Sequence, residues 1–326
     1  MEKSGQDLIL ATKPYAKENR ALSWYYTIST LLIYLAVLAG TYWNINLGAR
    51  IICSLLAGMV CVRLFVIYHD HQHHTILNKS KLANFIFTLF GIWIFAPRSI
   101  WKRSHDYHHN HNSKLFSASI GSFPIMTKQK FLTASAAERR MYLTIRNPIC
   151  IWLGFCTMFI YGMAVQSFLS NPHKHYDSLI ALVANALVVT AITYFGGWQA
   201  FILTWALPFT LTCGLGSYLF YAQHNFPAAT FKDNVDWTYE EAALDSSSSM
   251  KMNRVGEWIT ANIGYHHIHH MNSKIPFYRL KEAMKQIPEL QHPKVTSLRP
   301  GEIFRCMKLK VWDPEQNRML TLSEIS

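Results

Sequence analysis

The chain has 326 residues, of which half are hydrophobic and only 15% are charged, and its formal net charge is +12. Soluble globular domains carry about 25% charged residues, so this composition argues against a soluble enzyme and predicts an integral membrane protein. Beside so much apolar sequence, the positive charge favours anionic lipids or an acidic electron carrier as partners, and we expect no nucleic-acid partner.

The first third of the chain contains two long apolar runs and one short one. Residues 24–43 match the roughly 20 helical residues that cross a bilayer. Residues 50–68 form a second run, interrupted only by Arg63, and the turn at 44–48 joins the two. We therefore predict a helical hairpin here. Residues 82–97 are too few to span, and we expect an interfacial helix or a half-helix.

A polar, basic segment follows at residues 99–146. Between Thr75 and Pro148 the sequence has eleven Lys or Arg residues and two acidic ones. Positive charge accumulates in cytoplasmic loops, so we expect this segment on the cytoplasmic side.

Three more apolar runs, 149–169, 178–195 and 198–222, precede a polar tail. If histidines on either side of these runs share one metal site, the chain between them crosses the membrane an even number of times. Because Gly196-Gly197 predicts a tight turn, we pair the last two runs as a second hairpin and expect 149–169 to be interfacial or re-entrant. Pairing the first two runs instead is the alternative, and both choices place the N-terminus, the histidine clusters and the tail in the cytoplasm.

The predicted fold is therefore an all-α integral membrane fold. It has four transmembrane helices in two hairpins, interfacial helices, and a cytoplasmic helical cap with a histidine-ligated di-metal site. We treat residues 1–326 as one domain. Its parts are the first hairpin with the first cluster (22–74), a cytoplasmic segment with the second cluster (75–148), apolar segments with the second hairpin (149–222), and a cytoplasmic segment with the third cluster and the tail (223–326).

Histidine is bunched in three clusters whose spacing suits metal binding. Residues three and four apart share one face of a helix, so each cluster can direct two or three imidazoles at one point. The candidates are His69 and His73, then His105, His108 and His109, then His266, His269 and His270. Eight nitrogens exceed one ion's needs, so we predict two ions with four or five ligands each. His224, after the last apolar run, would be a ninth ligand.

Imidazole ligands suit iron, zinc, copper or nickel, and spacing alone does not choose among them. No cluster contains the glutamate of a zinc protease's HExxH motif. A metal transporter would need charged groups inside the apolar runs, and Arg63 is the one charged residue in their interior. Asp70, Asp106 and Asn262 are candidates to orient ligands, because a ligating imidazole usually donates its other N–H to an oxygen. We expect His173, His175 and His292 to be solvated.

These motifs resemble those of the membrane-bound fatty acid desaturases. Residues 69–73 read as that family's HxxxH box, and residues 105–109 and 266–270 read as its two HxxHH boxes. His224 resembles its additional histidine after the last membrane helix. The amino-acid sequence at residues 262–270, and also at 275–280 and 309–313, resembles that of bacterial acyl-lipid desaturases.

The resemblance implies a desaturase that introduces a cis double bond into an acyl chain, with O2 and two external electrons at a non-haem di-iron centre. A related hydroxylase, acetylenase or carotenoid-modifying oxygenase is the alternative. It also implies a multi-pass protein of the bacterial inner membrane, an acyl-lipid substrate, and a separate ferredoxin-like or cytochrome b5-like electron donor. The implied iron ligands are His69, His73, His105, His108, His109, His224, His266, His269 and His270.

The first box departs from the family pattern. His71 replaces a small or sulfur-containing residue, and His74 creates a second possible spacing, so the choice between His73 and His74 stays open. His111 and His267 are surplus to the boxes, and we expect them beside the centre or in solvent.

Overall fold

The computed structural model describes residues 3–43, 46–115 and 123–325. It is mainly helical. The helices are α1 (Gly5–Thr12), α2 (Arg20–Tyr42), α3 (Leu47–Gln72), α4 (Lys81–Trp93), α5 (Arg98–His111), α6 (Lys128–Thr133), α7 (Ala136–Ile145), α8 (Pro148–Trp152), α9 (Ser167–Ser170), α10 (Tyr176–Phe201), α11 (Leu207–Ala222), α12 (Tyr239–Asp245), α13 (Arg254–Ile259), α14 (His266–Met271), α15 (Leu280–Gln286) and α16 (Pro300–Lys308). Two π-helical segments, Phe155–Gln166 and Ile202–Ala206, precede α9 and α11.

The first two long helices, α2 and α3, occupy the two predicted apolar runs and pack against each other. Each begins at an asparagine whose side chain accepts a hydrogen bond from the first turn. Asn19 accepts from the backbone N–H of Leu22 (3.1 Å), and Asn46 accepts from that of Ala49 (2.9 Å). Residues 44 and 45 of the predicted turn lie outside the described residues.

The third long apolar segment, Tyr176–Ala222, folds back on itself at Gly197. This residue has φ 73° and ψ 179°, a conformation open to glycine, and it separates the two arms. The arms pack together, since the indole N–H of Trp205 donates to Asn185 Oδ1 (3.3 Å). The turn predicted at Gly196-Gly197 is therefore confirmed.

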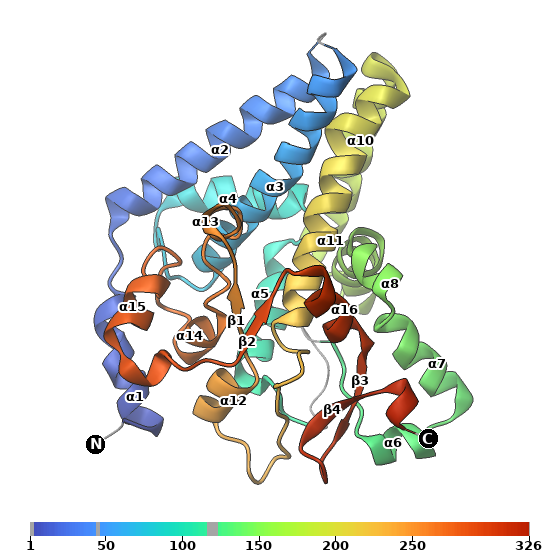
Figure 1. Cartoon of the computed structure of the whole chain (residues 1–326). Helices are drawn as coiled ribbons and strands as arrows, with labels where there is room; N and C mark the ends of the chain where they lie inside the picture. Colours follow the sequence, from blue (N-terminus) through green and yellow to red (C-terminus); the bar gives the residue numbers. More distant parts are fainter. Residues whose placement is uncertain (1–2, 44–45, 116–122, 326) are drawn as a thin grey trace.

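Both reversals of the long helices lie at one end of the molecule. Arg50, at the start of α3, donates from Nε to the Thr41 carbonyl oxygen (2.7 Å) and from its guanidinium to Gln199 Oε1 (2.8 Å). Figure 1 shows α2, α3 and α10 reaching the same tip, with α1, α14 and β3–β4 in the opposite half. The histidine clusters follow the ends of α3 and α11 that are remote from this tip.

The shorter apolar runs form helices that cannot cross a bilayer singly. Helix α4 has 13 residues, about 20 Å, against a hydrocarbon core of about 30 Å. The chain bends by 90° between α4 and α5, at Pro97. The Tyr68 hydroxyl donates to the Ala96 carbonyl oxygen (2.7 Å) and holds this bend against α3. The bend turns the second histidine cluster under the long helices.

Short elements form a cap around the ends of the long helices that are remote from the tip. The cap contains α1, α12–α16 and two small sheets: β1 (Ser249–Lys251) pairs in parallel with β2 (Val295–Ser297), and β3 (Leu309–Asp313) pairs antiparallel with β4 (Arg318–Thr321). The prediction of an all-α cap was therefore wrong for these strands. Asp313 Oδ1 accepts from two backbone N–H groups of the β3–β4 turn, and Asn317 has a positive φ there, which reverses the chain into a hairpin.

Candidate metal centre

Four separate elements bring the nine predicted histidine ligands into the middle of the molecule. The end of α3 carries the first cluster, α5 the second, and the six-residue helix α14 the third, while His224 follows the end of α11. Within α5 and α14 the spacing of three and four residues puts the imidazoles on one helix face, as the sequence predicts. Their nitrogens gather in two groups.

The first group contains five histidines, and its potential ligand atoms lie within 4.8 Å of one another. Its members are His69, His73, His105, His109 and His269. The Nε2 atom of His109 lies 3.1 Å from that of His105 and 3.0 Å from that of His269. All five are buried, and Nε2 of His73 has no hydrogen-bond partner among the described residues.

The second group contains His108, His224, His266 and His270, again with potential ligand atoms within 4.8 Å of one another. His224 Nε2 lies 3.1 Å from His108 Nε2 and 2.9 Å from His266 Nε2. His270 Nε2 is 3.3 Å from His108 Nε2 and 3.1 Å from His266 Nε2.

These spacings fit a shared metal ion in each group. Two nitrogens about 2.1 Å from one ion, in neighbouring coordination positions, are about 3 Å apart. Metal ligation also needs a neutral imidazole. Burial lowers the pKa of His224 to about 4, and burial together with neighbouring imidazoles holds the pKa of His109 well below its usual range. The donor set can therefore accept two ions without first losing protons near neutral pH.

Two oxygen acceptors hold imidazoles in place. Asp70 Oδ1 lies 3.0 Å from His69 Nδ1, and Asp70 Oδ2 accepts from the backbone N–H of Phe277 (2.8 Å). His224 Nδ1 lies 3.0 Å from the Ser246 carbonyl oxygen. Each contact favours a tautomer whose Nε2 lone pair faces the centre. The Asp70 contact is the one expected from the sequence, whereas Ser246 lies in a run of four serines that gives no such signal.

The structure corrects the other two predicted orienting residues. Asp106 accepts from Lys102 Nζ (2.7 Å), and its side chain is 44% exposed, so it serves a surface ion pair. Asn262 adopts a left-handed backbone (φ 59°), and its Nδ2 donates to the Phe277 carbonyl oxygen (3.1 Å). It shapes the turn before α14 and makes no hydrogen bond to a histidine side chain among the described residues.

The remaining histidines of the clusters lie outside both groups. Of the pair left open by the sequence, His73 belongs to the first group, whereas His74 turns away with φ 57°. The other three have neighbours of their own: His71 packs on the Phe87 ring, His111 stacks on Tyr107, and His267 Nε2 lies 3.2 Å from the Leu290 carbonyl oxygen.

One histidine expected to be solvated is buried instead. His175 is fully buried, and its Nδ1 lies 2.8 Å from the Ser99 hydroxyl, which also donates to Asp177 Oδ1. The contact between His175 and Ser99 links the start of α10 to the start of α5. His173 and His292 are exposed, as expected.

Two cavities adjoin the histidine groups, and the sequence did not predict their walls. An apolar cavity of about 100 Å³ lies against His69, His105 and His266. A larger cavity of about 350 Å³ lies against His108 and His224. Trp101, which stacks on His105 at 4.5 Å, lies four residues before it on α5, so helical periodicity could have identified it.

The chain is similar in sequence to known proteins. A family model described as fatty acid desaturase matches residues 46–300. The chain is 26% identical to a protein named fatty acid desaturase from Bacillus subtilis, over 83% of this chain and 77% of that protein. It is 24% identical to the sn-1 oleoyl-lipid 12-desaturase of a Synechocystis species, over 71% and 66% of the two chains. It is 23% identical to the sn-1 acyl-lipid omega-3 desaturase (ferredoxin) of a Nostoc species, over 79% and 70%.

Proposed function

The chain belongs to the fatty acid desaturase family, and from that premise we propose that it introduces a cis double bond into the acyl chain of a lipid, using O2 and two external electrons at a di-iron centre. The convergence of nine histidines from four elements into groups of five and four carries this proposal. We assign one iron ion to each group. Iron bound there would supply the oxidising power that removes hydrogen from unactivated methylenes.

The protein's own residues would hold and isolate the reacting chain. Asp70 and the Ser246 carbonyl fix the imidazoles to which they are bonded. The apolar cavity beside the histidines is lined by side chains such as Val66, Phe159 and Leu219, which suit an acyl chain and exclude water. Because the cavity lies against histidines of both groups, a methylene pair placed there would lie beside both ions.

We infer four membrane passes. Three helical segments are long and apolar enough to cross: α2, α3 and Tyr176–Ala222. The last has 47 residues, about 70 Å of helix, roughly twice a bilayer core, and it reverses at Gly197. The tip carries the exposed aromatic side chains of Trp43, Tyr194 and Trp198, which are typical of a membrane–water interface. The histidine groups would then lie on the cytoplasmic side of a bacterial inner membrane.

We assign electron delivery to a separate acidic protein, ferredoxin-like or cytochrome b5-like. The name of the Nostoc relative includes ferredoxin. On this chain, the exposed Lys274 donates from Nζ to the His73 carbonyl oxygen (2.5 Å), directly beside the first group, and the ion pair of Lys102 with Asp106 lies nearby, so the net charge there is positive. This positive surface complements an acidic carrier and gives the electron a short route.

Expression in a bacterium without this activity, followed by gas chromatography of its fatty acids, tests the proposal. Wild-type protein should add a new unsaturated peak that depends on O2. His269→Ala should abolish the peak while the protein remains in the membrane, because it removes one ligand of the first group. His292→Ala is the matched control, since it removes an exposed histidine outside both groups. A hydroxylated product without a new double bond would instead support the hydroxylase alternative, and purified protein with zinc and no iron would count against the di-iron centre.

A further inference from the structure

The larger cavity has cationic and polar side chains beside apolar ones in its wall, whereas the wall of the smaller cavity is mostly apolar. Its wall includes Arg146, Lys114 and Lys130, and its described lining residues include no Asp or Glu. It also reaches His108 and His224 of the second histidine group. A cavity of this size with three cationic side chains in its wall suits an anion of small-molecule dimensions.

Arg146 is the unusual member of this wall. Its side chain is fully buried, yet among the described residues its guanidinium donates only to uncharged oxygens: the Pro124 carbonyl (2.9 Å), the Tyr221 hydroxyl (3.2 Å), the Leu309 carbonyl (3.4 Å) and Asn225 Oδ1. Its Nε has no partner in the same part of the chain. A buried charge without a counter-ion is costly, so its position in the wall of a cavity indicates that a ligand supplies the missing negative charge.

A second cation increases this deficit of negative charge. Lys310 Nζ donates to the Arg146 carbonyl oxygen (2.5 Å), and the Lys310 side chain is almost fully buried. Burial, and to a lesser degree Arg146, lowers the pKa of Lys310 to about 8. An anion in the cavity would relieve the repulsion felt by both groups.

Phe220 lies in the walls of both cavities, which are therefore neighbours. It is the one described residue shared by both linings, and its ring packs on His108 with centroids 4.9 Å apart. A molecule with an anionic head in the larger cavity could thus extend an apolar tail past Phe220 into the smaller one. The tail would pass between the two histidine groups.

We propose that the larger cavity binds a phosphate ester on the head of the acyl substrate, with Arg146 as its principal anchor, while the acyl tail occupies the smaller cavity. Arg146 follows the last residue of α7, whose Met141 and Ile145 are exposed apolar side chains, as expected beside a bilayer surface where lipid phosphates lie. The inference rests on the proposed function and narrows its substrate to acyl groups carried on a phosphate ester. The ester is either a phospholipid diester or the phosphate of a coenzyme A-type carrier.

Equilibrium binding of lipid probes to the metal-loaded, detergent-solubilised full chain tests this inference. The probes are dioctanoyl-phosphatidylglycerol, dioctanoylglycerol without phosphate, and octanoyl-coenzyme A. Wild-type protein should bind at least one phosphate-bearing probe about tenfold more tightly than dioctanoylglycerol, as expected for a charge-assisted contact. A preference for dioctanoyl-phosphatidylglycerol identifies a phospholipid as the origin of the phosphate ester. A preference for octanoyl-coenzyme A alone identifies a coenzyme A-type carrier.

Two pairs of variants locate the preference. Arg146→Gln should remove it, whereas Arg63→Gln should retain it, because Arg63 is also buried and lacks a carboxylate partner among the described residues but lines neither cavity. If Arg146→Gln does not fold, Lys130→Gln should weaken binding of the phosphate-bearing probe about threefold, while Lys128→Gln, outside the wall, should not.

Equal binding of all probes by wild-type protein, or an unchanged preference in Arg146→Gln, would overturn the inference. The fatty-acid analysis separates this failure from failure of the proposed function. A wild-type protein that makes the new double bond without any phosphate preference retains the function and loses the anchor. A protein that shows the Arg146-dependent preference but yields no unsaturated product retains the anchor and loses the proposed function.

Discussion

At the residue scale, Asp70 joins two parts of the candidate centre. One carboxylate oxygen lies 3.0 Å from His69 Nδ1 and the other accepts from the Phe277 backbone, so Asp70 couples a ligand of α3 to the segment after α14. Partners of this kind typically change metal affinity 10–100-fold when mutated. We therefore expect Asp70→Asn, which preserves size and removes charge, to weaken iron binding by about that factor. Iron per chain, measured after dialysis at a fixed free-iron concentration, checks this.

Asp106→Asn is the matched control for that measurement. Asp106 follows His105 as Asp70 follows His69, but it pairs with Lys102 at the surface. Its iron content should equal that of the wild type. Equal loss of iron in both variants would show that charge near the boxes matters and that the specific contact of Asp70 does not.

The lowered pKa of Lys310 predicts that the free energy of unfolding depends on pH. Its folded-state pKa is lowered to about 8 from the usual 10.5, first by burial and then by Arg146. Below pH 8 both folded and unfolded chains hold the proton, and between about pH 8 and 10.5 the unfolded chain binds more protons, so this residue makes the free energy of unfolding rise with pH in that window. The stability of wild type relative to Lys310→Met should therefore increase from pH 8 to 10 by on the order of 1 kcal/mol, allowing for solvent screening. Denaturation in detergent at each pH measures it.

The exposed Lys308 provides the comparison for this titration. Lys308→Met should leave the pH dependence of wild type unchanged. A wild-type curve that runs parallel to that of Lys310→Met throughout this window would contradict the assignment.

The two aspartates also show what residue-level sequence reasoning could and could not give. Box spacing predicted eight histidines that the structure gathers, together with His224, in two groups, because helical periodicity fixes direction over one turn. Asp70 and Asp106 have identical sequence relations to a histidine. What separates them is a tertiary contact, the Phe277 N–H that covers Asp70, and the local sequence around the boxes does not contain it. Arg146 was unpredictable for the same reason, since its acceptors come from distant segments.

At the scale of elements, glycine sets how closely the short segment at α8 approaches α11. A Cβ atom on Gly214 would lie 2.8 Å from the Trp152 carbonyl oxygen, which is backbone and cannot easily move aside. We expect Gly214→Ala to lower the free energy of unfolding by about 1–3 kcal/mol, since the steric cost exceeds alanine's higher helix propensity. Thermal unfolding in detergent measures this change.

Gly216 lies on the same helix, and a Cβ atom there would meet no described atom within 4 Å, so Gly216→Ala isolates helix propensity. It should be neutral or stabilising by up to about 1 kcal/mol. A loss of stability equal to that of Gly214→Ala would mean that α11 tolerates no side chain here for a reason other than contact with Trp152.

The elements differ in how well the sequence predicted them. The long apolar helices and the turn at Gly197 follow from run length and from the conformational freedom of glycine. The strands β3 and β4 did not, because short hairpins depend on pairing and burial more than on composition. Their turn residues, Asp313 and Asn317, were the available signal.

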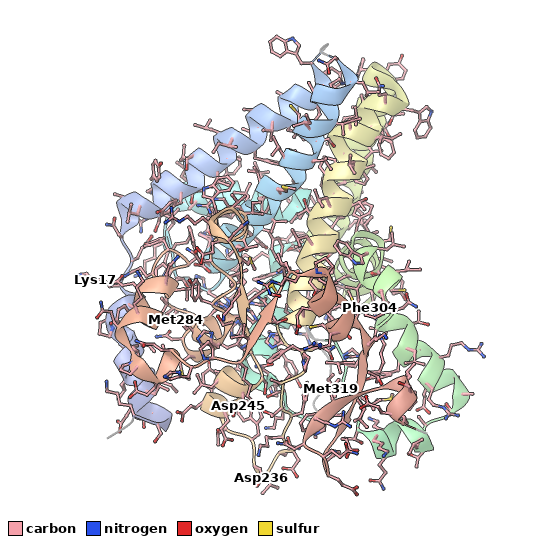
Figure 2. The ribbon with its side chains drawn as sticks, viewed as in Figure 1. Lys17, Asp236, Asp245, Met284, Phe304 and Met319 are labelled. Atoms are coloured by element: carbon pink, nitrogen blue, oxygen red, sulfur yellow. The ribbon has the colours of Figure 1, made fainter. Side chains whose placement is uncertain are left out.

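At the scale of the whole molecule, the position of the histidine groups depends on how often the chain crosses the membrane. Helices α3 and α11 both end beside the groups, and the tip holding Arg50 and Gln199 lies at the other end. Figure 2 shows Asp236, in the loop after α11, at the end of the molecule farthest from that tip. If the tip faces the periplasm, the loop at Asp236 and every histidine ligand face the cytoplasm, where reduced electron carriers are available.

A short epitope inserted after Gly197 or after Asp236 tests this arrangement. In spheroplasts, antibody should reach the epitope after Gly197 without permeabilisation and the epitope after Asp236 only after permeabilisation. Product formation by each tagged protein serves as the control for folding, because a tag that distorts the hairpin would separate His224 from the second group. A single crossing by residues 176–222 would bury Gly197 at mid-membrane and leave its epitope inaccessible in both conditions. That arrangement would place His224 and the third box on the opposite side of the bilayer from His108, and the two groups of nitrogens could not form.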